Sequence, residues 1–126
     1  MSRISATDGD RTLDNPSPEQ LHDLLADMNL TDNFVVVEDT NSNGNYFIQV
    51  ALDADPPYGG YTVEYRDGGP DAHFQATVLR ESDWGSVFDP GFERVVSVVC
   101  DWAAGGRSWR SALEWRVLDL KREEAR

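Results

Sequence analysis

Four segments with the residue pattern of β-strands follow one another in the middle of the chain, and no helical pattern separates them. They cover residues 34–38, 46–52, 61–66 and 74–79, with turn-forming residues between them. Runs of β-branched residues and alternation of apolar and polar residues predict strands. Strands that are clustered, rather than alternating with helices, are typical of an α+β fold with a mainly antiparallel sheet.

A helical pattern precedes these strands. Ser17 is a candidate N-cap, Pro18 suits the first helical position, and Gln20 completes a capping box. Apolar residues then recur at helical spacing up to Met28, and Asn29 is the expected end of the helix.

A second helix is predicted over residues 91–104, where one face carries Phe92, Val95, Val98, Val99 and Trp102. The valines in this segment make a strand the alternative, because β-branched side chains favour strands. The spacing favours the helix, and a Gly-Gly pair would end it. The last strand is predicted over residues 113–120.

The sequence therefore predicts a single α+β domain at residues 15–119, with a mainly antiparallel sheet of about five strands and two helices packed on one face. Residues 1–14 are polar and aperiodic, which predicts a flexible N-terminal arm, and residues 120–126 form a charged C-terminal tail. We expect neither a signal peptide nor a membrane span, because no apolar run is long enough. The single cysteine, Cys100, favours a reducing compartment, so a cytoplasmic location is expected.

Charge is distributed unevenly along the chain. The net charge is −12, from 23 acidic and 11 basic side chains. Between Arg11 and Arg66 there are ten Asp or Glu residues and no Lys or Arg, whereas basic residues gather at 107–122. Such a surface repels nucleic-acid phosphates and anionic membranes and attracts basic proteins. A basic protein partner is therefore predicted; the alternative is that the acidic residues only confer solubility.

No residue pattern indicates a catalytic or metal centre. His22 and His73 have no cluster of Cys or His near them in the sequence, and Cys100 lies in an apolar segment. The segment that begins Asp39-Thr-Asn-Ser-Asn-Gly matches the first half of a calcium loop, but its twelfth position is Val50 instead of Glu. A hairpin turn is the favoured interpretation. We expect no enzyme activity, no cofactor and no bound metal.

Several short motifs, in their order along the chain, resemble one protein family. They are Asn15-Pro-Ser-Pro18, Tyr46-Phe-Ile-Gln-Val50, Gly60-Tyr-Thr-Val-Glu-Tyr-Arg-Asp-Gly68, His73-Phe74, Gly105-Gly-Arg-Ser-Trp109 and Leu113-Glu-Trp115. Together they are similar to the Imm1 family of bacterial immunity proteins, over residues 15–118. The resemblance implies an α+β fold, no catalytic residues, and binding to a toxin domain, often an SCP1.201-like nucleic-acid deaminase.

For a toxin-binding surface we expect two loops, the acids near them and two aromatic anchors. The predicted residues are Asp39, Asn41, Asn43, Asp53, Asp55, Tyr58, Glu64, Asp67, Asp71 and Trp84. Tyr58 and Trp84 are the anchors, because exposed aromatic residues are favoured at interfaces.

Of the other tryptophans, Trp102 and Trp115 are predicted in the core, and Trp109 is a candidate for exposure. Two alternative functions remain open. One is a carboxylate-rich domain that binds a metal or small ligand, and the other is a structural subunit that self-associates through Trp84 or a sheet edge.

Overall fold

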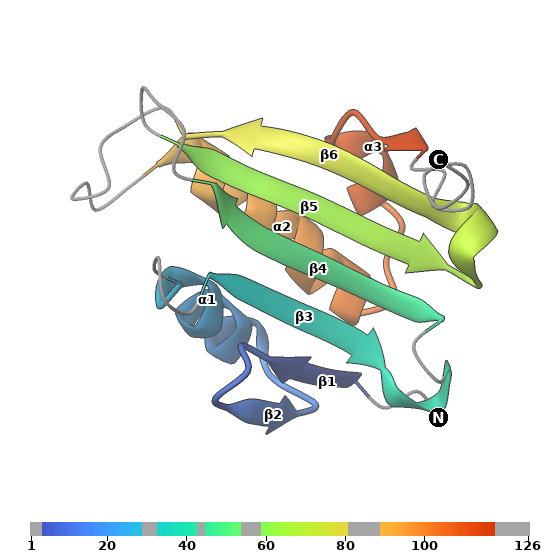
Figure 1. The fold of residues 1–126 in the computed structure, drawn as a ribbon. Coiled ribbons are helices and arrows are strands. Elements are labelled where there is room, and N and C mark those ends of the chain that lie inside the picture. Colours follow the sequence, from blue (N-terminus) through green and yellow to red (C-terminus); the bar gives the residue numbers. More distant parts are fainter. Residues whose placement is uncertain (1–3, 29–32, 43–44, 54–58, 81–88, 118–126) are drawn as a thin grey trace.

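A seven-stranded antiparallel sheet forms the centre of the described structure (Figure 1). The computed structural model describes residues 4–28, 33–42, 45–53, 59–80 and 89–117. The strands are β1 (Ile4–Thr7), β2 (Thr12–Asp14), β3 (Phe34–Asp39), β4 (Tyr46–Asp53), β5 (Gly60–Asp67), β6 (His73–Leu79) and β7 (Arg116–Val117). Their order across the sheet is β2-β1-β3-β4-β5-β6-β7. The helices are α1 (Pro18–Ala26), α2 (Pro90–Ala103) and α3 (Trp109–Ala112), and the 3-10 turns are η1 (Thr40–Ser42) and η2 (Pro70–Ala72).

Helices α1 and α2 cover one face of this sheet (Figure 1). Their buried side chains join those of the strands in one cluster, which includes Leu21, Leu24 and Leu25 of α1 and Val95, Val98 and Val99 of α2. Burying each such side chain contributes about 1.5–3 kcal/mol, so this face supplies most of the apolar burial. The predicted α+β class with a mainly antiparallel sheet is confirmed, with seven described strands instead of five.

Both long helices begin as predicted. Ser17 accepts a hydrogen bond from the backbone N–H of Gln20, whose side chain accepts one from the N–H of Ser17, so the capping box is formed. Helix α1 ends at Ala26, before Asn29. At α2, Asp89 accepts a hydrogen bond from the N–H of Phe92. The segment is a helix and not the alternative strand, because its apolar residues at spacings of three and four all meet the sheet.

The prediction of a flexible N-terminal arm is wrong. Strand β1 lies between β2 and β3 in the sheet, and Ala6 is completely buried opposite Val37. The two strands are too short, and their buried residues too small, to give a periodic signal in the sequence. The domain therefore includes residues from Ile4 onward, and the predicted tail at 120–126 lies outside the described residues.

The turn between β1 and β2 is organised by a buried carboxylate. Asp8 is only 6% exposed, and it accepts hydrogen bonds from the N–H groups of Asp10 and Arg11 at 3.0 and 2.8 Å. The guanidinium of Arg11 contacts Asp8 and also Asp27, at the end of α1, each at 3.1 Å. The hairpin is thereby attached to the helix.

The predicted strand at 113–120 is also largely wrong. Residues 109–112 form helix α3, the strand β7 covers Arg116–Val117, and residues 118–120 lie outside the described part of the chain. The irregular segment between them is set by the side chain of Trp115, which contacts Tyr65 edge-on and donates its indole N–H to the carbonyl of Trp109 at 3.3 Å.

The tryptophans differ from expectation in one case. Trp109 is buried, 5% exposed, because its backbone N–H binds Asp101 and its indole N–H binds the carbonyl of Gly106. Trp102 and Trp115 are partly buried against the core, as predicted. None of the described helices has the length and apolar character needed to cross a membrane.

Gly91 provides a test of the contact between α2 and β6. A Cβ atom at Gly91 would collide with the backbone carbonyl of Leu79, whereas one at Gly69 would meet no atom within 4 Å. We expect Gly91→Ala to lower the free energy of unfolding by about 1–3 kcal/mol. The added methyl group would clash with the backbone carbonyl of Leu79, which cannot move aside as a flexible side chain could. Urea unfolding of Gly91→Ala beside the control Gly69→Ala measures this, and equal stability of the two variants would contradict the packing.

Asp8 provides a test of the N-terminal hairpin by pH. Hydrogen bonds from the Arg11 backbone N–H, and then from Asp10 and the Arg11 side chain, lower the pKa of Asp8 below its usual 3.8, against the raising effect of burial. A carboxylate with a lowered pKa stabilises the fold above its usual pKa, and that stability is lost as the pH falls through 3.8 toward the folded value.

We therefore expect Asp8→Asn to cost about 1–3 kcal/mol at pH 7. The difference from the wild type should shrink as the pH falls from about 5 to about 3. Denaturant unfolding at several pH values measures it, with Asp10→Asn, exposed in the same turn, as the control. A difference that stays constant with pH would show that the charge of Asp8 is not involved.

Candidate functional site

The second face of the sheet, opposite α1 and α2, is covered by none of the described helices (Figure 1). Cross-strand pairing places its side chains in three rows. The central row contains Thr7, Val36, Gln49, Glu64, Gln75 and Arg116. One neighbouring row contains Ser5, Glu38, Phe47, Arg66 and His73, and the other contains Phe34, Ala51, Thr62 and Thr77. We call these fifteen residues the uncovered face.

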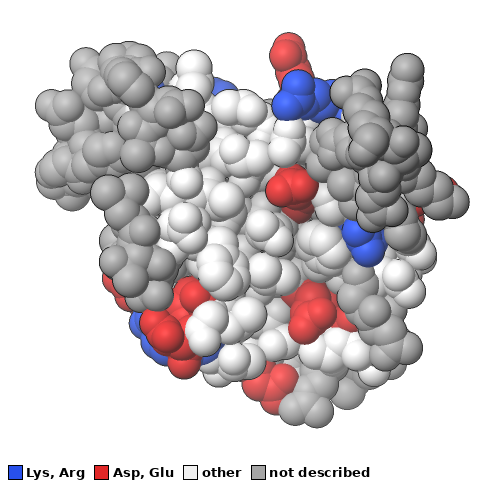
Figure 2. All heavy atoms as spheres, in the orientation of Figure 1, with Lys and Arg blue, Asp and Glu red and all other residues white. Residues whose placement is uncertain are grey.

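Figure 2 shows the uncovered face as mostly uncharged surface with separate carboxylates on it. Its charged members are Glu38, Glu64, Arg66 and Arg116. Three of its apolar side chains, Phe34, Val36 and Phe47, are partly exposed.

A hydrogen-bonded cluster holds Glu64 in place on this face. His73, 5% exposed, brings its Nε2 to 2.9 Å from Glu64 Oε1, and its Nδ1 accepts a hydrogen bond from Arg66 Nε at 3.4 Å. Because the Arg66 nitrogen can only donate, the ring carries its proton on Nε2 and donates it to Glu64. The guanidinium of Arg66 also lies 5.4 Å from the ring centre of Phe47, which contacts His73 edge-on.

The structure separates Glu64 from two other predicted site residues. Asp39 and Asp67 line a groove of about 320 Å³ on the helix side of the sheet, at one end of β3 and β5. Tyr46, Arg107 and Arg110 line the same groove, and Arg110 lies 3.4 Å from Asp67. The two carboxylates thus share a groove with two arginines, and Glu64 lies on the opposite face.

The remaining predicted residues are dispersed. Asn41 is exposed in η1, where its N–H binds Asp39 Oδ1 at 3.0 Å, and Asp71 is exposed in η2. Asp53 ends β4 opposite Gly60, at the other end of the hairpin from Asp67. Outside the described residues lie Asn43, Asp55, Tyr58 and Trp84. The predicted residues that the structure describes therefore lie on both faces and at both ends of the sheet.

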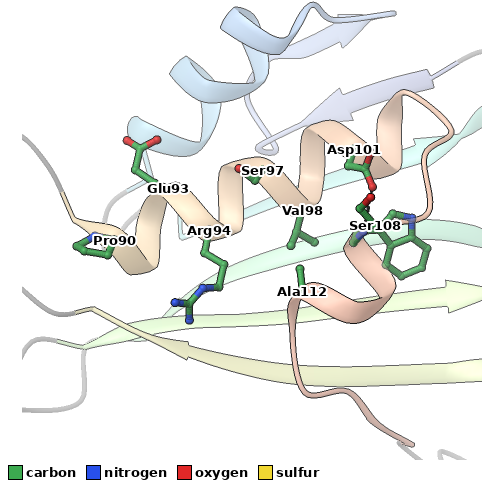
Figure 3. Close-up of a pocket in the computed structure, with 9 residues that line it drawn as sticks. Pro90, Glu93, Arg94, Ser97, Val98, Asp101, Ser108 and Ala112 are labelled. Carbon is green, nitrogen blue, oxygen red and sulfur yellow. Dashed lines mark hydrogen bonds between the residues drawn. The ribbon is translucent and has the colours of Figure 1, made fainter.

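A second groove, of about 500 Å³, lies between α2 and α3. Figure 3 shows Val98 of α2 and Ala112 of α3 pointing toward each other across it, with Arg94 and Asp101 along its margins. The carboxylate of Asp101 is engaged with the N–H of Trp109 at 2.9 Å. This groove is a packing seam between two helices, lined by both polar and apolar side chains.

The described residues contain no cluster suited to metal or nucleophilic chemistry. Within that part of the chain, no three His, Cys, Asp or Glu side chains are close enough to hold a metal ion. Burial raises the pKa of the Cys100 thiol, which keeps the sulfur protonated and weakly nucleophilic at neutral pH.

Comparison with known proteins gives no match: no family model, no curated protein and no solved structure is similar to this chain. The site must therefore be interpreted from its own geometry. Glu64 lies in the predicted strand 61–66 and is among the predicted site residues, whereas His73 comes directly before the predicted strand 74–79 and is not among them. Their contact depends on the β5–β6 register, in which Arg66 lies opposite His73.

The cluster makes a testable contribution to stability. We expect His73→Ala to lower the free energy of unfolding by about 1–3 kcal/mol, because Glu64 loses a hydrogen bond and Phe47 and Arg66 lose a packed neighbour. Thr77→Ala, an exposed position on the same strand, is the control. Chemical denaturation of both variants measures the difference. A smaller loss of stability for His73→Ala than for Thr77→Ala would mean that the hydrogen bonds of the cluster do not stabilise the fold.

Proposed function

We propose that this chain is an immunity protein that binds a cognate bacterial toxin domain in the cytoplasm and neutralises it, without catalysing a reaction itself. The single observation that carries the proposal is the charge distribution: ten acids and no Lys or Arg between Arg11 and Arg66. The order of motifs that resembles the Imm1 family supports the same class of function.

In the folded chain, the acidic segment of the sequence forms one half of the sheet and its adjoining helix. Residues 12–65 build α1, β2, β3, β4 and most of β5, which reach from one sheet edge to its middle. The described acids of this half are Asp14, Glu19, Asp23, Asp27, Glu38, Asp39, Asp53 and Glu64. From Arg66 onward the chain forms β6, β7, α2 and α3, and there arginines are interspersed among the acids.

A negative half of this kind suits a partner that binds nucleic acid. A nucleic-acid deaminase needs a basic groove for the phosphate backbone of its substrate. An acidic protein is attracted to that groove from a distance and can occlude it, so that charge accelerates association. Apolar contacts then determine how slowly the complex dissociates. The proposed partner is thus a basic toxin domain of the SCP1.201-like deaminase class, with no direct contact to nucleic acid or membrane.

The proposal predicts neutralisation that depends on salt. The probe is a purified bacterial toxin domain of the SCP1.201-like deaminase class, assayed for deamination of single- and double-stranded DNA and of RNA. We expect stoichiometric inhibition by this chain, with an association rate constant that falls at least tenfold between about 50 and 500 mM salt, because screening shortens the attraction.

An unaffected toxin domain at excess chain would contradict the proposal. So would turnover of a small substrate by the purified chain alone. If the toxin domain is inhibited but the association rate does not change with salt, the neutralising function stands and the role of charge in association is contradicted.

A further inference from the structure

We infer that the partner docks on the uncovered face, with Gln49, Glu64 and Gln75 at the centre of contact, and not on the acidic loops at the ends of the sheet. This inference rests on the proposed function. It specifies which surface of the chain is used and what chemistry the partner must present there.

The composition of the uncovered face resembles that of a protein interface. Interfaces have a core with few charges, enriched in aromatic residues, and a polar margin. Here Phe34, Val36 and Phe47 accompany uncharged polar residues, and Arg116 lies at the β7 margin. A solvated sheet face is polar, so the two phenylalanines and the valine are the positions at which this face departs from that pattern.

The central row defines what the partner must supply. Glu64 lies between Gln49 of β4 and Gln75 of β6 in the register of the sheet. A carboxylate flanked by two amides offers several oxygen acceptors, which suit a lysine ammonium or arginine guanidinium. The two arginines of the face are already engaged within the sheet, Arg66 with His73 and Arg116 with Gln75.

Charge also decides which occupant fits. A second copy of this chain carries the same net charge of −12 and would be repelled. A basic protein is attracted by the net charge of the whole chain, whereas the uncovered face itself carries two carboxylates and two arginines. We therefore expect the partner to present a Lys or Arg side chain opposite Glu64 and apolar side chains that cover Phe34 and Phe47.

Glu64 is held in position before the partner arrives. His73 binds its Oε1 at 2.9 Å, and the side chain of Glu64 is 23% exposed. A side chain that is already ordered loses little conformational entropy on binding, which favours affinity. His73 is thus a positioning residue that acts through Glu64.

The groove that contains Asp39 and Asp67 is a weaker candidate. Arg107 and Arg110 line the same groove, and Arg110 lies 3.4 Å from Asp67. The uncovered face also carries two carboxylates and two arginines, so the number of charges does not separate the two surfaces. They differ in what holds the carboxylate: Asp67 is ion-paired with Arg110 in the groove, whereas Glu64 is hydrogen-bonded to the imidazole of His73 on the uncovered face.

The test compares two variants that add the same charge. Gln49→Arg places a cation at the centre of the uncovered face, and Ser97→Arg places one on the exposed side of α2. With a purified SCP1.201-like toxin domain that the wild type binds as the probe, calorimetry should show at least about a hundredfold weaker binding for Gln49→Arg. The change for Ser97→Arg should stay within about threefold. Circular dichroism and thermal unfolding verify that both variants fold.

A second pair tests the carboxylate. Glu64→Gln should weaken binding about tenfold, and Asp23→Asn, which removes the same charge from an 82% exposed position on α1, should change it less than threefold. The pair keeps the inference testable if Gln49→Arg does not fold.

The outcomes separate the inference from the proposed function. If the wild type binds and inhibits the toxin domain while Gln49→Arg and Glu64→Gln behave like their controls, the docking surface is wrong and the proposed function stands. If the wild type does not bind the toxin domain, both the docking surface and the proposed function are contradicted. A wild-type dimer in solution that Gln49→Arg dissociates would assign the face to a second copy and overturn the inference.

Discussion

The packing of both long helices on a single face of the sheet is the constraint on which the rest of the structure depends. Leu25 of α1 and Val99 of α2 are buried in one cluster with Val37 and Val50 of the strands. All the strands contribute alternate residues to that cluster or to the opposite face. Among the described residues, helices therefore cover the sheet on one side, and no described helix lies on the other.

That one-sided architecture explains why the molecule can be strongly acidic and still present a mostly uncharged surface. Most acids of the first half of the chain lie on α1, in turns or at strand ends, where water solvates them. The middle of the uncovered face keeps Val36, Gln49 and Thr62, with Glu64 fixed among them by His73. In the proposed complex, the solvated acids would provide the long-range attraction and the middle of the uncovered face the short-range contact.

Much of the fold could be predicted from the sequence because its signals are local. The capping box at Ser17 and the alternation in the four central strands depend on neighbouring residues, and both were predicted correctly. The N-terminal hairpin was missed because Ala6 is buried only through its pairing with Val37. The last strand was overestimated because the contact of Trp115 with Tyr65 redirects the chain.

The candidate site could be predicted only in part, for a similar reason. Acidity is visible in composition, but which carboxylates share a surface depends on strand register. Asp39 and Asp67 share a groove on the helix side, whereas Glu64, three residues from Asp67, lies on the other face. Radical footprinting of the chain, free and bound to a purified SCP1.201-like toxin domain, measures directly which face the partner covers. We expect less labelling of Phe34 and Phe47 in the complex and unchanged labelling of His22; unchanged labelling of both phenylalanines would contradict docking on the uncovered face.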